Sequence, residues 1–108
     1  MSLEIPDSVI EIGEDAFYGC QSLASVGILG SVKKIGEEAF FGCKTLASVK
    51  IPNSVKKICN YAFVACTSLS SVEFGGTVAQ WKAVEKGNNW NGGVPAKCVK
   101  CADGEAEL

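Results

Sequence analysis

The chain has 108 residues, 47% of them hydrophobic and 20% charged, which fits one globular domain and excludes a largely disordered chain. It contains no histidine, so Ser-His-Asp and Cys-His catalysis and His-ligated zinc are excluded. The formal net charge is −2 without a single arginine, and no apolar run reaches the roughly 20 residues of a membrane span, so we expect neither nucleic-acid binding nor membrane insertion.

Residues 1–73 consist of a repeated unit with a truncated start. Three units of 23 residues align without a gap, at 5–27, 28–50 and 51–73. They read IPDSVIEIGEDAFYGCQSLASVG, ILGSVKKIGEEAFFGCKTLASVK and IPNSVKKICNYAFVACTSLSSVE. A fixed period in this range predicts a solenoid, in which equivalent residues stack on one another.

The constant positions of the unit are almost all apolar, which predicts continuous core stripes. Val26 and Ile28 alternate with Ser25 and Gly27, as expected for a short strand with one buried face. Proline ends this strand in two units, and a short helical or turn segment is expected on the opposite side of the coil. Leu3 aligns with Val26, so we expect the first coil to be uncapped, either because further repeats precede it or because it packs against another molecule.

Residues 74–108 depart from the repeat and are predicted to form a C-terminal cap. Phe74 keeps the Ile28 position, and a gap-free alignment places Trp81 at the Ile12 position. Thr77 is the expected N-cap of a helix over about 77–86, with Val78, Trp81 and Val84 on its buried face. A further strand is predicted over about 94–101.

The unit I-P-x-S-V-x-x-I-G-x-x-A-F-x-x-C-x-x-L-x-x-V resembles the BspA-like leucine-rich repeats, and the closing GTVAQWKAVEKGNNWN resembles the segment that ends many such arrays. The resemblance implies an α/β right-handed leucine-rich repeat solenoid. Its parallel strands would line the concave face, with short helices or turns on the convex face. It also implies a secreted or cell-surface protein that is not an enzyme, has no cofactor, and takes part in adhesion or binding of host proteins.

One cysteine recurs in every unit, at Cys20, Cys43 and Cys66. Sulfur ligands of one zinc ion lie within roughly 4 Å of each other, whereas the outer two of these three are about 10 Å apart, so the column cannot converge on a metal. Burial as small apolar residues is the favoured interpretation. For Cys98 and Cys101 three interpretations stay open: structural free thiols, a disulfide within the cap or to Cys59, and a metal or redox site.

Two groups of charged residues have ordinary structural interpretations. The acid pairs Glu14/Asp15 and Glu37/Glu38 are expected at the N-terminal ends of short helices, where negative charge is favourable. The lysine pairs Lys33/Lys34 and Lys56/Lys57 are expected to form a solvated basic patch, flanked by Ile10/Glu11 and Ala79/Gln80.

The predicted binding face consists of the outward strand positions, because solenoids bind along their strands. These positions are Ser25, Gly27, Ser48, Lys50, Ser71 and Glu73. They predict a module that binds a protein partner, and self-association through the uncapped first coil is a further expectation. A structural spacer and a thiol- or metal-dependent activity at Cys98 and Cys101 are the alternatives.

Overall fold

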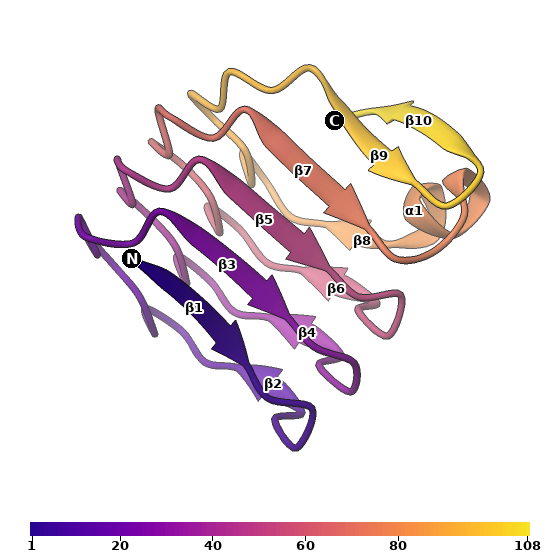
Figure 1. Cartoon of the computed structure of the whole chain (residues 1–108), viewed down its shortest axis with the longest axis horizontal. Coiled ribbons are helices and arrows are strands. Elements are labelled where there is room, and N and C mark those ends of the chain that lie inside the picture. The colour runs from indigo at the N-terminus through magenta and orange to yellow at the C-terminus, as the bar shows by residue number, and fades with distance from the viewer.

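The computed structural model describes residues 1–108, which wind into a right-handed solenoid of stacked coils (Figure 1). One side of every coil is a four-residue strand, and these strands form a six-stranded sheet in the order β1-β3-β5-β7-β9-β10. The strands are β1 Ser2–Ile5, β3 Ser25–Ile28, β5 Ser48–Ile51, β7 Ser71–Phe74, β9 Cys98–Cys101 and β10 Gly104–Glu107. All neighbouring pairs are parallel except the last, where β10 folds back antiparallel to β9.

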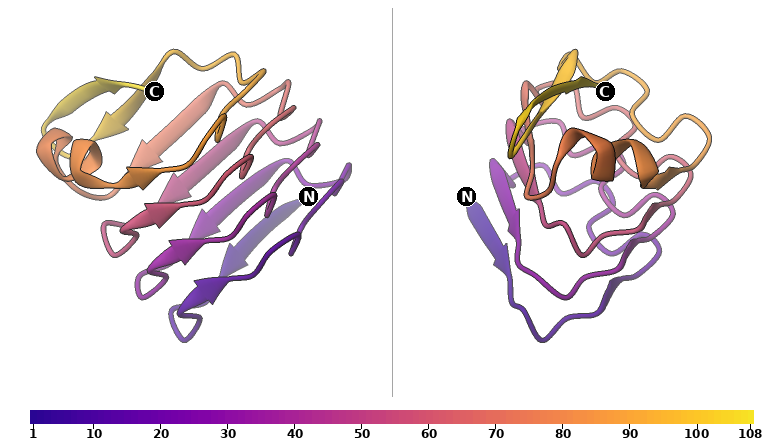
Figure 2. Two further views of the ribbon diagram at one scale, coloured as in Figure 1. Left: turned by 180° about the vertical axis from the view of Figure 1, so that it is seen from behind. Right: turned by 90° about the vertical axis from the view of Figure 1, so that its right-hand side faces the viewer.

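A second, narrower sheet forms another side of the coils (Figure 2). Its two-residue parallel strands are β2 Glu11–Ile12, β4 Lys34–Ile35, β6 Lys57–Ile58 and β8 Glu85–Lys86. In the first three strands the isoleucine is buried and the preceding charged residue points outward. This second sheet was not expected from the sequence, because two residues are too short to show an alternating pattern.

The remaining side of each coil is built from turns, which settles the choice between helices and turns that the repeat had left open. Asp15 and Glu38 adopt φ angles of 57° and 56°, which are left-handed and interrupt any helix. The amides of Asp15 and Phe17 donate instead to the carbonyls of Glu37 and Ala39 in the next coil. The expectation that the acid pairs occupy helix N-termini is therefore wrong, because the turn backbone satisfies its hydrogen bonds between coils.

The core consists of the stacked apolar columns, as the repeat predicted. Val32, Ile35, Phe40 and Leu46 in the second coil are all 0% exposed. The phenylalanine column is a stack of parallel rings, with centroids 5.2 Å apart between Phe17 and Phe40 and 5.0 Å apart between Phe40 and Phe63. Offset aromatic stacking of this kind adds to the area that the rings bury.

The cap begins with the predicted helix, which is shorter than expected. Helix α1 spans Val78–Ala83, and Thr77 and Gln80 form a reciprocal capping box at its start. The helix is an insertion in the fourth coil, so β8 pairs with β6 through Ile58 and Lys86. The gap-free placement of Trp81 at the Ile12 position, and of Gln80 beside the lysines, is therefore wrong; Lys86 and Glu85 occupy those positions.

Lys86 occupies the position that isoleucine fills in the other coils, and its ammonium group interacts with neighbouring groups of the cap. Its Nζ donates to the carbonyls of Trp81 and Val84 at 2.7 and 3.1 Å, which caps the C-terminal end of α1. The same Nζ lies 4.4 Å from the centroid of the Trp81 ring, a cation–π contact. Burial lowers the pKa of Lys86. The aliphatic stem thus completes the coil where the other coils use isoleucine.

Both tryptophans belong to the cap core, as the helix pattern predicted for Trp81. Trp81 and Trp90 are 1% and 8% exposed, and their rings meet at a centroid distance of 5.9 Å. Trp90 also packs edge-on against Phe63, so the aromatic stack continues into the cap. The predicted strand over 94–101 forms only at Cys98–Cys101, and the hairpin partner β10 was not foreseen.

Candidate functional site

The predicted binding residues lie together on the outer surface of the six-stranded sheet, which we call the strand face. Ser25, Ser48 and Ser71 are in direct register on β3, β5 and β7, and each is half-buried. Ser2 extends this row onto β1, where its Oγ accepts a 2.8 Å hydrogen bond from Ser25 Oγ. The result is a row of four hydroxyl groups, one per strand, running across the sheet.

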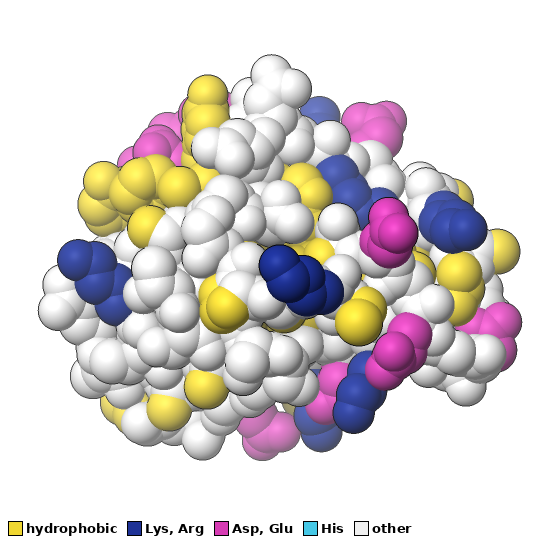
Figure 3. All heavy atoms as spheres, turned by 90° about the horizontal axis from the view of Figure 1, so that it is seen from above, with side chains coloured by type: hydrophobic (Ala, Val, Ile, Leu, Met, Phe, Trp, Pro, Cys, Tyr) yellow, Lys and Arg dark blue, Asp and Glu magenta, His cyan; other side chains and the backbone are white.

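A second row on the strand face carries charges. The strand register places side by side Glu4, Gly27, Lys50, Glu73, Lys100 and Glu105. From Lys50 onward the sign alternates along the row, so no two like charges are direct neighbours there. Figure 3 shows lysine and acidic side chains similarly interspersed on another face, without a large area of one sign.

Gly27 interrupts the charged row and leaves a hollow between Glu4 and Lys50. The hollow has a volume of about 420 Å³, and the hydroxyl row forms one side of it. A Cβ atom added at Gly27 would meet only the Glu4 side chain, at 3.8 Å, so the position is open to solvent above the sheet. The strand face therefore has a depression between β1 and β5.

The structure extends the hydroxyl and charged rows that the repeat predicted by four residues: Ser2, Glu4, Lys100 and Glu105. The first two could have been found from the alignment of Leu3 with Val26, which fixes the register of β1. Lys100 could not, because the helix insertion shifts the fourth coil out of the 23-residue period. Glu105 belongs to β10, which has no counterpart in the repeat.

The repeated cysteines are mainly structural. Cys43 and Cys66 are 0% exposed, and each thiol donates to the phenylalanine carbonyl of the preceding coil, Cys43 to Phe17 at 3.2 Å and Cys66 to Phe40 at 3.1 Å. The neighbouring Cys43 thiol and burial raise the pKa of Cys66. Cys20 is half-buried and lacks such a bond. The Cys43 and Cys66 thiols therefore fill space in the core, as the sequence suggested, and also donate weak hydrogen bonds to backbone carbonyls.

The remaining cysteines do not converge on one site. All six cysteines are free thiols in the structure, and no group of three or more Cys, Asp or Glu side chains is placed to hold a metal ion. Cys98 is exposed on the strand face, with its sulfur 3.8 Å from Glu105 Oε1. Cys101 is half-buried at the end of the same strand, and the nearby Asp103 adds to the effect of burial in raising its pKa.

The first coil carries an apolar surface of its own. Leu3, Val9 and Phe17 are only partly buried and surround an opening of about 330 Å³. Self-association through this coil stays a prediction.

Comparison with known proteins identifies the family to which these coils belong. Residues 1–84 match the family described as BspA type leucine rich repeat region. The chain belongs to this BspA-type leucine-rich repeat family. No helix in it has the length and apolar character needed to cross a membrane.

Two solved structures of bacterial leucine-rich repeat proteins are similar to this BspA-type chain. One is from Bacteroides ovatus, with 34% identity and a TM-score of 0.70 over 85% of this chain and 22% of the other. The second is the Treponema pallidum leucine-rich repeat protein, with 32% identity and a TM-score of 0.64 over 72% of this chain and 42% of the other. The chain therefore spans less than half of either structure. No protein with a curated description is similar to it in sequence.

Proposed function

We propose that the chain is a non-catalytic binding module of a cell-surface protein, which contacts a protein partner through the strand face. The observation that supports this proposal most is the pair of in-register rows, hydroxyl groups in one and charges in the other, held on a continuous six-stranded sheet. A rigid scaffold lowers the entropy cost of ordering side chains on binding.

The composition of the strand face also indicates the kind of partner. It presents serine and charged side chains but no aromatic or arginine anchors, which usually dominate the affinity of protein interfaces. Charges of alternating sign contribute more to specificity and to the rate of association than to affinity. The partner we propose therefore has a complementary pattern of charges and binds each copy of this surface weakly, so that strong attachment depends on several contacts together.

The proposal is tested by removing the two rows at their centre. The strand-face variant combines Ser48→Ala, Lys50→Ala, Ser71→Ala and Glu73→Ala, which keeps the net charge unchanged. The matched control combines Asp7→Ala, Ser22→Ala, Lys44→Ala and Ser68→Ala, four exposed residues outside the strand face. Binding to a panel of purified extracellular proteins is measured by surface plasmon resonance.

We expect any partner of the wild-type chain to lose about ten-fold or more in affinity for the strand-face variant and to bind the control normally. Equal binding by both variants would show that the strand face is not the contact surface and would favour the role of a structural spacer.

A further inference from the structure

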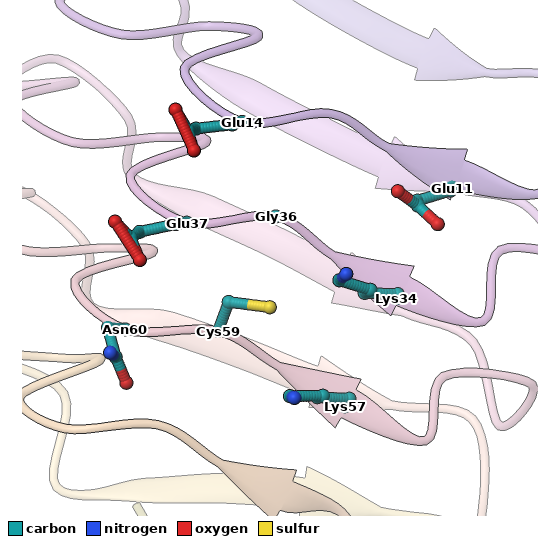
Figure 4. A pocket seen from close by; sticks show the side chains of 8 residues that line it. All are labelled: Glu11, Glu14, Lys34, Gly36, Glu37, Lys57, Cys59 and Asn60. Atoms are coloured by element: carbon teal, nitrogen blue, oxygen red, sulfur yellow. The ribbon is translucent and has the colours of Figure 1, made fainter.

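A groove lined by opposite charges lies on a different side of the solenoid, between the second sheet and the turns (Figure 4). Its volume is about 300 Å³. Lys34 and Lys57 lie on one wall, and Glu14 and Glu37 lie on the other, with the Cys59 side chain between them. The groove shares no residue with the strand face, so the two sites can be tested independently.

The walls are like-charge pairs that the coil register forces together. Lys34 and Lys57 are direct neighbours on β4 and β6, at the spacing of about 4.8 Å between strands. Glu14 and Glu37 follow equivalent glycines in successive coils, and the amide of Asp15 donates to the carbonyl of Glu37 at 3.0 Å. Like charges held side by side repel, so a group of opposite charge between them relieves the repulsion.

The charges that flank these pairs differ on the two walls. Glu11 pairs with Lys34 on β2, and Glu85 pairs with Lys57 on β8, so each lysine has one acidic neighbour. On the opposite wall, Glu14 and Glu37 have further acidic residues as neighbours. Burial raises the pKa of the neighbouring Glu38, and the negative charges of Asp15, Glu37 and Glu14 raise it further. The glutamate wall thus has an excess of negative charge, and the lysine wall is closer to balanced.

The floor of the groove is bare backbone in the second coil. A Cβ atom added at Gly36 would lie 2.6 Å from the carbonyl oxygen of Ile12, so no side chain fits there without displacing the first coil. In the third coil this position is Cys59, whose half-buried side chain points into the groove. The floor therefore leaves the space between the two walls open beside Gly36, and Cys59 partly fills it in the third coil.

We propose that this groove binds a small zwitterion, with its ammonium group between Glu14 and Glu37 and its phosphate or carboxylate oxygens between Lys34 and Lys57. The ammonium group donates to the carboxylates, and the lysines donate to the anion. A zwitterion carries the two opposite charges that complement both walls, whereas a simple ion complements only one. Free metabolites and lipid headgroups both carry this chemistry.

The test follows amide shifts of the full chain by two-dimensional NMR during titration with phosphoethanolamine. We expect saturable shifts at Gly36, Cys59 and Asn60, and about five-fold weaker binding of inorganic phosphate or ethylamine alone. β-Alanine tests a carboxylate in place of the phosphate, and vesicles of phosphatidylethanolamine test the lipid source. Phosphate binding as tightly as phosphoethanolamine, or no shift at about 20 mM ligand, would overturn the proposal.

Variants locate the site. Lys34→Gln with Lys57→Gln, or Glu14→Gln with Glu37→Gln, should weaken phosphoethanolamine binding about ten-fold. The control Lys33→Gln with Lys56→Gln removes the same charge from exposed neighbours outside the groove and should change binding less than about two-fold.

Cys59 supplies a second measurement without any substitution. Phosphoethanolamine should slow its alkylation by iodoacetamide, followed by mass spectrometry, while the exposed Cys98 on the strand face reacts at an unchanged rate. Equal effects of the control and groove variants, or unprotected Cys59 at saturation, would also overturn the proposal. Unchanged partner binding by the groove variants would leave the strand-face proposal intact.

Discussion

Ala65 is the residue whose replacement we expect to stabilise the fold. It occupies a turn position with φ of 64°, where the two preceding coils place Gly19 and Gly42, with φ of 70° and 73°. A left-handed conformation costs a residue with a Cβ atom about 1–2 kcal/mol. Glycine avoids this cost but loses about 0.5–1 kcal/mol more backbone entropy on folding. Ala65→Gly should therefore raise the free energy of unfolding by about 0.5–1 kcal/mol.

The reverse substitution and a control separate this effect from packing. A Cβ atom at Gly42 would touch only Gly19, at 3.9 Å, so Gly42→Ala should destabilise through its φ angle alone, by about 0.5–1 kcal/mol. Ala47 is exposed and is not among the residues with positive φ, so Ala47→Gly should destabilise by a similar amount.

Urea unfolding monitored by the fluorescence of the buried Trp81 and Trp90 measures all three variants. Destabilisation by Ala65→Gly equal to that by Ala47→Gly would refute the reasoning.

Three further predictions concern the core, the thiols and the cap. Phe40→Ala should lower the free energy of unfolding by about 3–5 kcal/mol, because this fully buried ring stacks on both Phe17 and Phe63; urea unfolding checks it. Above about pH 9 the free energy of unfolding should fall more steeply with pH in the wild type than in Cys66→Ala, by up to about 1.4 kcal/mol per pH unit. The reason is that the folded protein keeps the Cys66 thiol, whose pKa is raised, protonated, whereas the unfolded chain releases this proton. A parallel pH dependence of the two proteins would contradict this. Thr77→Ala should cost about 1 kcal/mol by removing the helix cap, and Thr77→Ser should restore most of it in thermal unfolding followed by circular dichroism.

Much of the fold was predictable because the repeat imposes one register on every coil. Once Val26 aligns with Val49 and Val72, the strand pairing, the buried columns and the outward rows of serine and charged residues follow. The burial of Cys43 and Cys66 followed from the same stacking argument. These features depend on residues that recur at a fixed spacing, which is the kind of signal that a sequence carries clearly.

The misses occur where backbone hydrogen bonds between coils override local patterns. The sequence Gly-Glu-Glu-Ala-Phe is compatible with a helix, but the left-handed residues Asp15 and Glu38 turn their amides toward the next coil. The fourth coil contains the inserted helix α1, so Lys86 takes the place of an isoleucine, a substitution that no apolar pattern predicts. The groove was missed because each wall consists of equivalent residues from successive coils. Lys34 lies beside Lys57 on one wall, and Glu37 lies beside Glu14 on the other.

The central claim, that the strand face contacts a protein partner, is tested most directly by site-specific photo-crosslinking. The photoreactive residue p-benzoylphenylalanine replaces the half-buried Ser48 of the strand face in one protein and the exposed Ser22 in another. We predict that a partner identified by surface plasmon resonance is crosslinked from position 48 and not from position 22. Crosslinking of that partner from position 22 alone would contradict the claim.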